Sequence, residues 1–180
     1  MKILILIASG VEEVEALAPR DLFLRAGLEV DMMGIDNNIN IISSHKLGID
    51  ILPYDPSYFT KNYDALMIPG GKVGTNNIDN SPYIDEILSY FITNNKLVSA
   101  ICAAPSILGK RGYLKNQEYT CYPGWEKEEY GHYLNEGVVK SGQFITGRSV
   151  YYSFPFAIAI IDYLLGHDLA NKIDNQIKGI

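Results

Sequence analysis

The feature that most constrains the fold of this chain is an alternation between short apolar runs and longer stretches of helical periodicity. The run from residue 4 to residue 7 contains four consecutive aliphatic side chains, which is typical of a strand covered on both faces. Strands of this kind that alternate with helices form parallel sheets with crossover connections. We therefore expect an α/β fold with strands at Lys2–Ala8, Glu29–Met33, Ala65–Ile68 and Leu97–Ile101.

Helical periodicity fills the intervals between and after these strands. We expect helices at Glu12–Ala26 and Tyr83–Thr93, the second opened by Ser81-Pro82 in the usual N-cap and N1 order. Near the end of the chain, Phe154–Leu165 is strongly apolar at helical spacing and is followed by Gly166, a typical stop signal. The last helix is expected at Leu169–Ile177.

The remaining segments predict shorter elements. The polar stretch Asn37–Asn40 is expected to turn into Ile41–Ser44, which would pair with Ile49–Leu52 as a β-ribbon, and Ile145–Thr146 is expected as a late strand. The chain contains no repeats, low-complexity tracts or long linker. We therefore expect one domain over residues 1–180.

Composition narrows the classes of function. The chain is 47% hydrophobic and 20% charged, as in ordinary globular proteins, and its net charge of −6 argues against a nucleic-acid-binding protein. No basic block would anchor it to an anionic membrane. The apolar run at the start is too short for a signal peptide, and no window approaches 18 uncharged apolar residues, so we expect a cytoplasmic protein.

Cysteine and histidine are sparse. The two cysteines, Cys102 and Cys121, form neither a disulfide framework nor a C-x-x-C pair, and the three histidines are dispersed. We expect no metal and no cofactor.

The segment around Cys102 is the first candidate for chemistry. A predicted strand ends at this residue, and Ala100, Ala103 and Ala104 surround it before an apparent helix starts near Pro105. This A-x-C-x-A arrangement parallels a nucleophile elbow, in which small neighbours permit a tight turn and leave the nucleophile exposed. A nearby helix N-terminus would favour the thiolate. A buried structural cysteine is the alternative interpretation of the same residues.

Two other segments follow predicted strands. Gly70-Gly71 could aim backbone N–H groups into a crevice and form half an oxyanion hole, with the N–H of Ala103 as the other half, although a simple turn also explains two glycines. Glu12 and Glu13 are expected to be solvated charges at a helix N-terminus. Glu15 lies among apolar neighbours, which leaves two interpretations open. It could point inward and share a proton with a thiolate, or it could lie on the surface.

Taken together, these segments resemble the ThiJ/PfpI family, which includes the parkinsonism-associated protein deglycase and its bacterial relatives and belongs to the class I glutamine amidotransferase-like superfamily. The resemblance covers essentially the whole chain. The motifs that carry it are Ala8–Glu15, Ile68–Gly71 with Gly74 and Asn77, Ala100–Pro105, and Thr146–Ser149 with the following Ser153-Phe154 and Phe156-Ala157.

The resemblance implies a flavodoxin-like three-layer sandwich, with helices on both faces of a mainly parallel sheet, and a homodimer. It also implies a site in which Cys102 is the nucleophile and a protonated Glu15 hydrogen-bonds to its sulfur. The N–H groups of Gly71 and Ala103 would flank the sulfur as an anion or oxyanion pocket, with Gly70 beside them.

The chain departs from the family at one position. Close relatives of the deglycase carry a histidine in a short T-H-P-like segment, where this chain has Tyr122 in the run from residue 119 to 123. Tyrosine, with a pKa near 10, is a poor base at neutral pH. His132 and Arg148 are further auxiliary candidates, and Cys121 is expected to be packed. A full Cys-His-Asp triad is therefore not supported, which argues against amidase or protease activity.

Two hypotheses of function follow. The leading one is a glyoxalase- or deglycase-type enzyme that acts on 2-oxoaldehydes such as methylglyoxal or their protein adducts, with Cys102 attacking the aldehyde and Glu15 shuttling the proton. The alternative is a redox sensor or stress-response protein in which Cys102 is oxidised to the sulfinic acid. A role in thiazole monophosphate biosynthesis has no supporting thiazole or phosphate site in the sequence.

Overall fold

One six-stranded sheet organises the protein. The computed structural model describes residues 1–35, 39–59 and 63–180. The strands lie in the order β2-β1-β5-β6-β10-β9, and all neighbours are parallel except β9, which runs antiparallel to β10. The bounds are β1 (Lys2–Ile7), β2 (Glu29–Gly34), β5 (Ala65–Ile68), β6 (Leu97–Ile101), β9 (Val138–Ser141) and β10 (Phe144–Gly147).

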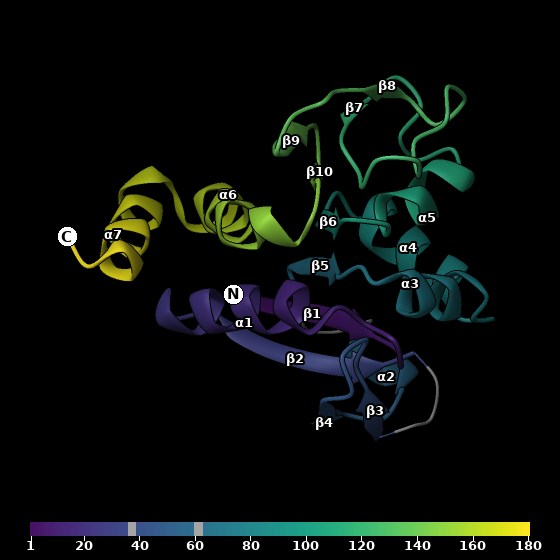
Figure 1. Cartoon of the computed structure of the whole chain (residues 1–180), viewed down its shortest axis with the longest axis horizontal. Coiled ribbons are helices and arrows are strands. Elements are labelled where there is room, and N and C mark those ends of the chain that lie inside the picture. Colours follow the sequence, from purple (N-terminus) through teal and green to yellow (C-terminus); the bar gives the residue numbers. More distant parts are fainter. Residues whose placement is uncertain (36–38, 60–62) are drawn as a thin grey trace.

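Helices cover both faces of this sheet (Figure 1). One face carries α1 (Glu13–Arg25), α6 (Ser153–Leu165) and α7 (His167–Lys178), and the other carries α3 (Lys72–Asp79), α4 (Ile84–Thr93) and α5 (Pro105–Lys110). The five parallel strands follow the flavodoxin-like order 2-1-3-4-5. The predicted three-layer α/β sandwich is confirmed.

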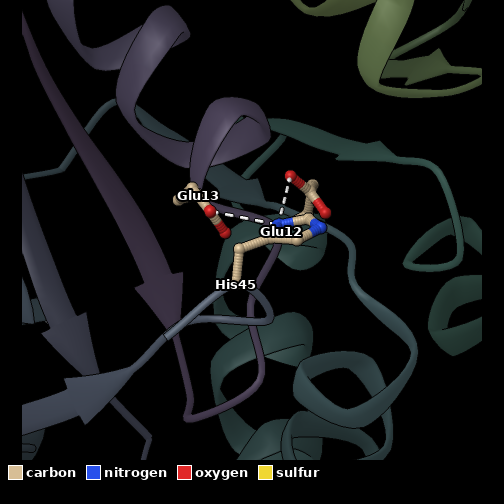
Figure 2. A group of neighbouring side chains, drawn as sticks. All are labelled: Glu12, Glu13 and His45. Carbon is tan, nitrogen blue, oxygen red and sulfur yellow. Dashed lines mark hydrogen bonds and ion pairs between the residues drawn. The ribbon is translucent and has the colours of Figure 1, made fainter. Parts of the chain in front are cut away.

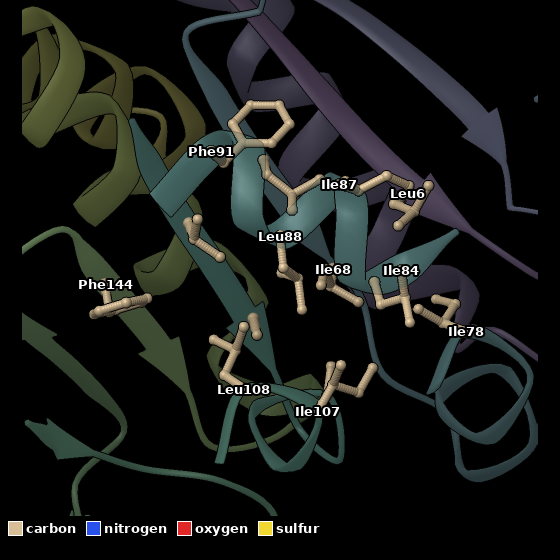
Figure 3. Packing of buried hydrophobic residues seen from close by; sticks show 14 of the residues in the cluster. Leu6, Ile68, Ile78, Ile84, Ile87, Leu88, Phe91, Ile107, Leu108 and Phe144 are labelled. Atoms are coloured by element: carbon tan, nitrogen blue, oxygen red, sulfur yellow. The ribbon is translucent and has the colours of Figure 1, made fainter. Parts of the chain in front are cut away.

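The consecutive apolar residues of β1 explain the two cores. Successive side chains of a strand point to opposite faces, so Leu4 and Leu6 enter the core beneath α4, while Ile3, Ile5 and Ile7 enter the core beneath α1 and α6. Figure 3 shows the first core, in which the buried face of α4 packs onto the sheet through Ile84, Ile87, Leu88 and Phe91.

Smaller elements lie at the edges. The predicted β-ribbon forms from β3 (Asn40–Ile42) and β4 (Gly48–Asp50), one or two residues earlier than expected. The expected turn at Asn37–Asn40 falls partly on residues 37 and 38, which lie outside the described residues. The other short elements are α2 (Pro56–Phe59), β7 (Glu118–Tyr119), β8 (His132–Tyr133) and the 3₁₀ helix η1 (Val150–Tyr152).

Several elements were not expected from the sequence. The stretch after Gly71, for which the sequence analysis named no element, forms the helix α3 although Gly74 lies inside it. Gly74 is needed there because a Cβ would lie 2.7 Å from the backbone nitrogen of Val11. The edge strand β9 was also missed, and the late strand β10 extends one residue beyond Ile145–Thr146 at each end. Within the described residues, no helix is long and apolar enough to span a membrane.

The helix α6 allows a matched test of the core. Phe156 is fully buried between α6 and the sheet, whereas Phe154, two residues earlier on the same helix, is 47% exposed. We expect Phe156→Ala to lower the free energy of unfolding by about 3–5 kcal/mol, because the lost contacts leave a cavity. Phe154→Ala should cost less than about 1 kcal/mol. Urea denaturation of both variants measures the difference, and equal losses would contradict this description of the core.

Candidate active site

The backbone at Cys102 adopts a conformation that most residues avoid. Cys102 directly follows β6 and has a φ of 64°, in the left-handed region that costs a non-glycine residue about 1–2 kcal/mol. Hydrogen bonds hold it from both sides: its N–H donates to the carbonyl oxygen of Gly147 at 2.9 Å, and its carbonyl oxygen accepts the N–H of Tyr122 at 2.8 Å. The predicted elbow is therefore present, and it is fixed by two distant segments.

Two backbone donors lie at the Cys102 sulfur. The N–H groups of Gly71 and Ala103 both act to lower the pKa of the thiol, as the resemblance implied. Burial and the negative charge of Glu15 act in the opposite direction and raise that pKa to about 12. The helix α5, whose N-terminus was expected to favour the thiolate, starts at Pro105, three residues after Cys102. The thiol therefore stays protonated while Glu15 is ionised.

Glu15 lies in the first turn of α1 and is fully buried. Its Oε2 accepts the N–H of Gly70 at 3.0 Å, and burial raises the pKa of the carboxyl to about 7. The interaction with the Cys102 thiol acts to lower this pKa, and Oε1 is buried without a partner among the described residues. The inward alternative for Glu15 is thus the one observed.

The two side chains form a coupled pair. With a pKa of about 7, the Glu15 carboxyl exists in both protonation states near neutral pH, and in its protonated form it no longer repels a thiolate but can donate a hydrogen bond to it. The protons of the pair therefore belong to the site rather than to either residue. Such an arrangement can pass a proton between a sulfur, a carbon and an oxygen of a bound substrate.

Gly70 is required by close packing rather than by a turn. A Cβ at this position would lie 2.5 Å from Oε2 of Glu15 and 2.6 Å from Cβ of Cys102. Its N–H is already bonded to Glu15, so it is not available to an oxyanion, contrary to the expectation from the sequence. Gly71, with a φ of 91°, is the glycine whose N–H reaches the sulfur.

The pair opens into a cavity of about 480 Å³ at the carboxyl ends of β5 and β6. Ligands of open α/β sheets bind at this edge. A larger groove of about 640 Å³ lies between α6 and α7, but its charged residues pair with one another, as Lys140 does with Asp162, and its lining includes no cysteine, serine or threonine among the described residues. The cavity at Cys102 is therefore the candidate site. Its lining comprises Glu12, Glu15, His45, Gly71, Lys72, Cys102, Ala103, Tyr122, Trp125 and Val150.

Two residues of this lining, Glu12 and His45, form a polar cluster with Glu13 (Figure 2). His45, in the turn between β3 and β4, places Nδ1 3.0 Å from Oε1 of Glu13 and 3.6 Å from Oε1 of Glu12. The Ser44 hydroxyl contacts both carboxylates, at 3.0 and 3.2 Å. Glu12 and Glu13 were expected to be solvated, but their side chains are only 18% and 16% exposed because the β3–β4 turn folds over them.

The charges of this cluster stabilise one another. Although burial acts to raise the pKa of Glu13, its hydrogen bonds, including that to His45, lower it to about 2, and the hydrogen bond to Glu13 together with the charges of Glu12 and Glu13 raises the pKa of His45. These three residues are the one group of metal-ligand type found among the described residues. Their atoms already pair with one another, and the expectation of a metal-free site stays a prediction.

The remaining candidates from the sequence are separated by the fold. Tyr122 lines the cavity, but in the part of the chain that the structure describes neither His132, in β8, nor Arg148 does so. Cys121 is fully buried, and burial raises the pKa of its thiol to about 12. Four residues of the lining were not among the candidates from the sequence: His45, Lys72, Trp125 and Val150. Local signals existed for three of them, because Lys72 directly follows Gly71, Val150 directly follows Ser149, and Trp125 lies three residues after Tyr122. His45 reaches the cavity only through long-range packing.

Comparisons with known proteins find relatives that match most of the chain. A family model described as the DJ-1/PfpI family matches residues 1–163. Protein dj-1beta of Drosophila melanogaster is 30% identical over 98% of this chain and 95% of its own length. The glutathione-independent glyoxalase DJ-1 of Schizosaccharomyces pombe is 27% identical over 99% of this chain and 98% of its own. Among solved structures, oxidized Toxoplasma gondii DJ-1 superposes with a TM-score of 0.90, at 26% identity, and the match covers 98% of this chain and 97% of that one.

The packing at Gly70 gives a prediction for the site. In Gly70→Ala, the new methyl group should displace Glu15 from Cys102 and lower the free energy of unfolding by about 1–3 kcal/mol, as overpacking does. Gly48→Ala is the matched control, because no described atom lies within 4 Å of a Cβ at Gly48. Denaturation and the pH profile of Cys102 alkylation measure both effects. A Gly70→Ala protein indistinguishable from Gly48→Ala would contradict the geometry.

The buried carboxyl of Glu15 gives a prediction for the pH dependence of stability. Its pKa is raised from 4.5 to about 7 in the folded protein, so the folded state binds the proton more tightly than the unfolded state. Its contribution is fully present below pH 4.5 and is lost as the pH rises through about 7. Relative to Glu15→Gln, the wild type should lose about 3 kcal/mol across this window. Urea denaturation at several pH values measures the difference, and parallel profiles would contradict the buried pair.

Proposed function

This chain belongs to the DJ-1/PfpI family, and on that premise we propose that it is a cofactor-independent glyoxalase- or deglycase-type enzyme that acts on 2-oxoaldehydes. The observation that carries the proposal is the buried Glu15 carboxyl in contact with the Cys102 thiol, with a pKa raised to about 7. A group whose pKa lies near the working pH can both accept and return a proton. The Schizosaccharomyces pombe relative named as a glutathione-independent glyoxalase supports the same reaction class.

The first step would be addition to the aldehyde. Glu15 takes the thiol proton, the Cys102 sulfur bonds to the aldehyde carbon, and the proton passes from Glu15 to the aldehyde oxygen. The product of this step is a hemithioacetal, and Glu15 is again a carboxylate. The N–H groups of Gly71 and Ala103 stabilise the negative charge on the sulfur, and on the oxygen as it develops.

The next steps would be an isomerisation and a hydrolysis. Glu15 removes the hydrogen of the former aldehyde carbon as a proton, which leaves an enediolate, and returns it to the ketone carbon while the hydroxyl proton passes to the ketone oxygen. The resulting 2-hydroxy thioester is cleaved by water, which breaks the carbon–sulfur bond, restores the thiol and releases a 2-hydroxy acid. The sum is addition of one water to the 2-oxoaldehyde, with no external oxidant or reductant.

This reaction does not need the family histidine that Tyr122 replaces. Amide hydrolysis requires a proton for a leaving amine, whereas here the leaving group is the Cys102 thiolate, which the Gly71 and Ala103 N–H groups stabilise. One acid–base residue therefore suffices. The substrates proposed are methylglyoxal and related 2-oxoaldehydes, or their protein adducts.

A second candidate function is a redox sensor. The Toxoplasma gondii relative was solved in an oxidized form. In this chain, two equivalents of hydrogen peroxide would convert the Cys102 thiolate through the sulfenic acid to the sulfinate. The Gly71 and Ala103 N–H groups and a protonated Glu15 are suitable donors for its oxygens. Stable sulfinate formation at Cys102 without 2-oxoaldehyde turnover would favour this function over catalysis.

Turnover of methylglyoxal tests the leading proposal. The purified protein should form lactate, and Cys102→Ser should lose the activity by more than about a hundredfold because the covalent step is lost. Glu15→Gln should lower kcat by about 10²–10⁴, the usual effect of removing a general acid–base residue. Cys121→Ala is the matched cysteine control and should keep the activity. Equal rates for wild type and Cys102→Ser would exclude the proposed enzyme.

The quaternary structure is a separate proposal. Family membership supports a homodimer, and exposed apolar side chains, such as Tyr151 at 81% exposure, leave surface that a second copy could cover. We expect light scattering at micromolar concentration to give twice the 20.1 kDa chain mass. A particle of the single-chain mass would contradict the dimer.

A further inference from the structure

The cavity above Cys102 is larger than the smallest substrate of the proposed reaction requires. Its volume of about 480 Å³ lies in the range of pockets that enclose drug-sized ligands. Methylglyoxal carries only a methyl group on its ketone carbon and would fill a small fraction of this space. A substrate with a larger substituent would exclude more water from the site.

The order of the strands divides the lining of the cavity into two ends. Glu12 and His45 belong to the β1 side, at the start of α1 and in the β3–β4 turn. Tyr122 and Trp125 follow β7, and Val150 follows β10, on the opposite side. Because β5 and β6 lie between β1 and β10, Cys102 at the end of β6 lies between a polar end and an apolar end.

The apolar end is exposed in the free protein and is held in place. Tyr122 is 48% and Val150 43% exposed, and Trp125 is partly buried against the core beneath α5. The N–H of Tyr122 donates to the carbonyl oxygen of Cys102 at 2.8 Å, and the N–H of Trp125 donates to that of Tyr122 at 3.0 Å. These hydrogen bonds therefore fix the backbone of both aromatic residues relative to Cys102. Covering such surface with an apolar group is favourable and costs little reorganisation.

We propose that Tyr122, Trp125 and Val150 form a subsite for a large apolar substituent, so that the enzyme prefers 2-oxoaldehydes with an aromatic group on the ketone carbon. This inference rests on the proposed function. The dicarbonyl unit lies at Cys102, within reach of the Gly71 and Ala103 N–H groups, and the ring of the substrate contacts the aromatic side chains. The product is a 2-hydroxy acid with an aromatic substituent at its hydroxyl-bearing carbon.

The test compares two probes, phenylglyoxal and methylglyoxal. The measured quantity is the kcat/KM for phenylglyoxal divided by the kcat/KM for methylglyoxal. Comparing this ratio between variants removes the intrinsic reactivity of each aldehyde from the result. We expect Tyr122→Ala and Trp125→Ala each to lower the ratio by about threefold to tenfold, the usual effect of losing an aromatic contact. Tyr122→Phe keeps the ring and should change the ratio by less than about twofold.

Tyr163→Ala is the matched control, since Tyr163 is a 45% exposed tyrosine on α6 that is not part of the cavity lining. It should leave the ratio unchanged. Tyr122→Ala decides the question even where Trp125→Ala is too unstable to assay, because Tyr122 is half exposed and its loss leaves no core cavity.

The outcomes separate the two proposals. An unchanged ratio in Tyr122→Ala, with Cys102-dependent turnover of methylglyoxal intact, would overturn the subsite and leave the proposed function standing. Absence of Cys102-dependent turnover of both probes in the wild type would overturn the proposed function and the subsite with it.

Discussion

The site depends on one backbone constraint, the left-handed conformation of Cys102. A φ of 64° is unfavourable for cysteine, and the chain maintains it through hydrogen bonds to Gly147, at the end of β10, and to Tyr122, in the loop after β7. Both partners are far from Cys102 in sequence, so the elbow forms only when β6 and β10 have paired and the β7 loop has packed onto them. The position of the nucleophile therefore depends on the complete fold. Tyr122 contacts the elbow through its backbone N–H, so this contact does not depend on the Tyr122 side chain.

The second constraint is the burial of Glu15. A carboxyl in this position destabilises the fold when it is ionised, and among the described residues the N–H of Gly70 pairs its Oε2 while Oε1 stays unpaired. Such strain is typical of functional sites, where the surrounding structure compensates for it. Here the compensation comes from two apolar cores, one on each face of the sheet, which share β1, which precedes the helix that carries Glu15, and β6, which precedes Cys102.

The sequence predicted the central architecture because its strands are short and apolar without interruption, as in β1, and the helices between them are strongly periodic, as in α4. The errors lie where the local signal was weak or the cause was distant. The edge strand β9 faces the core with only part of its surface, and α3 contains Gly74, whose role is set by contact with Val11. Cys102 and Glu15 were recognisable from motifs. The use of the Gly70 N–H and the position of His45 were not, since both follow from contacts across more than 30 residues.

The cluster at the polar end connects the β-ribbon to the chemistry of the site. The charge of Glu12 contributes to the raised pKa of Glu15, and His45 lies 3.6 Å from that carboxylate. A protonated His45 opposes the field that Glu12 exerts on the pair, while Glu13 and Ser44 hold the imidazole in place. The proton affinity of Glu15 therefore depends on the docking of the β3–β4 turn against the start of α1. A segment outside the central sheet thus helps to set the protonation of the buried pair, although it supplies neither the nucleophile nor the carboxyl.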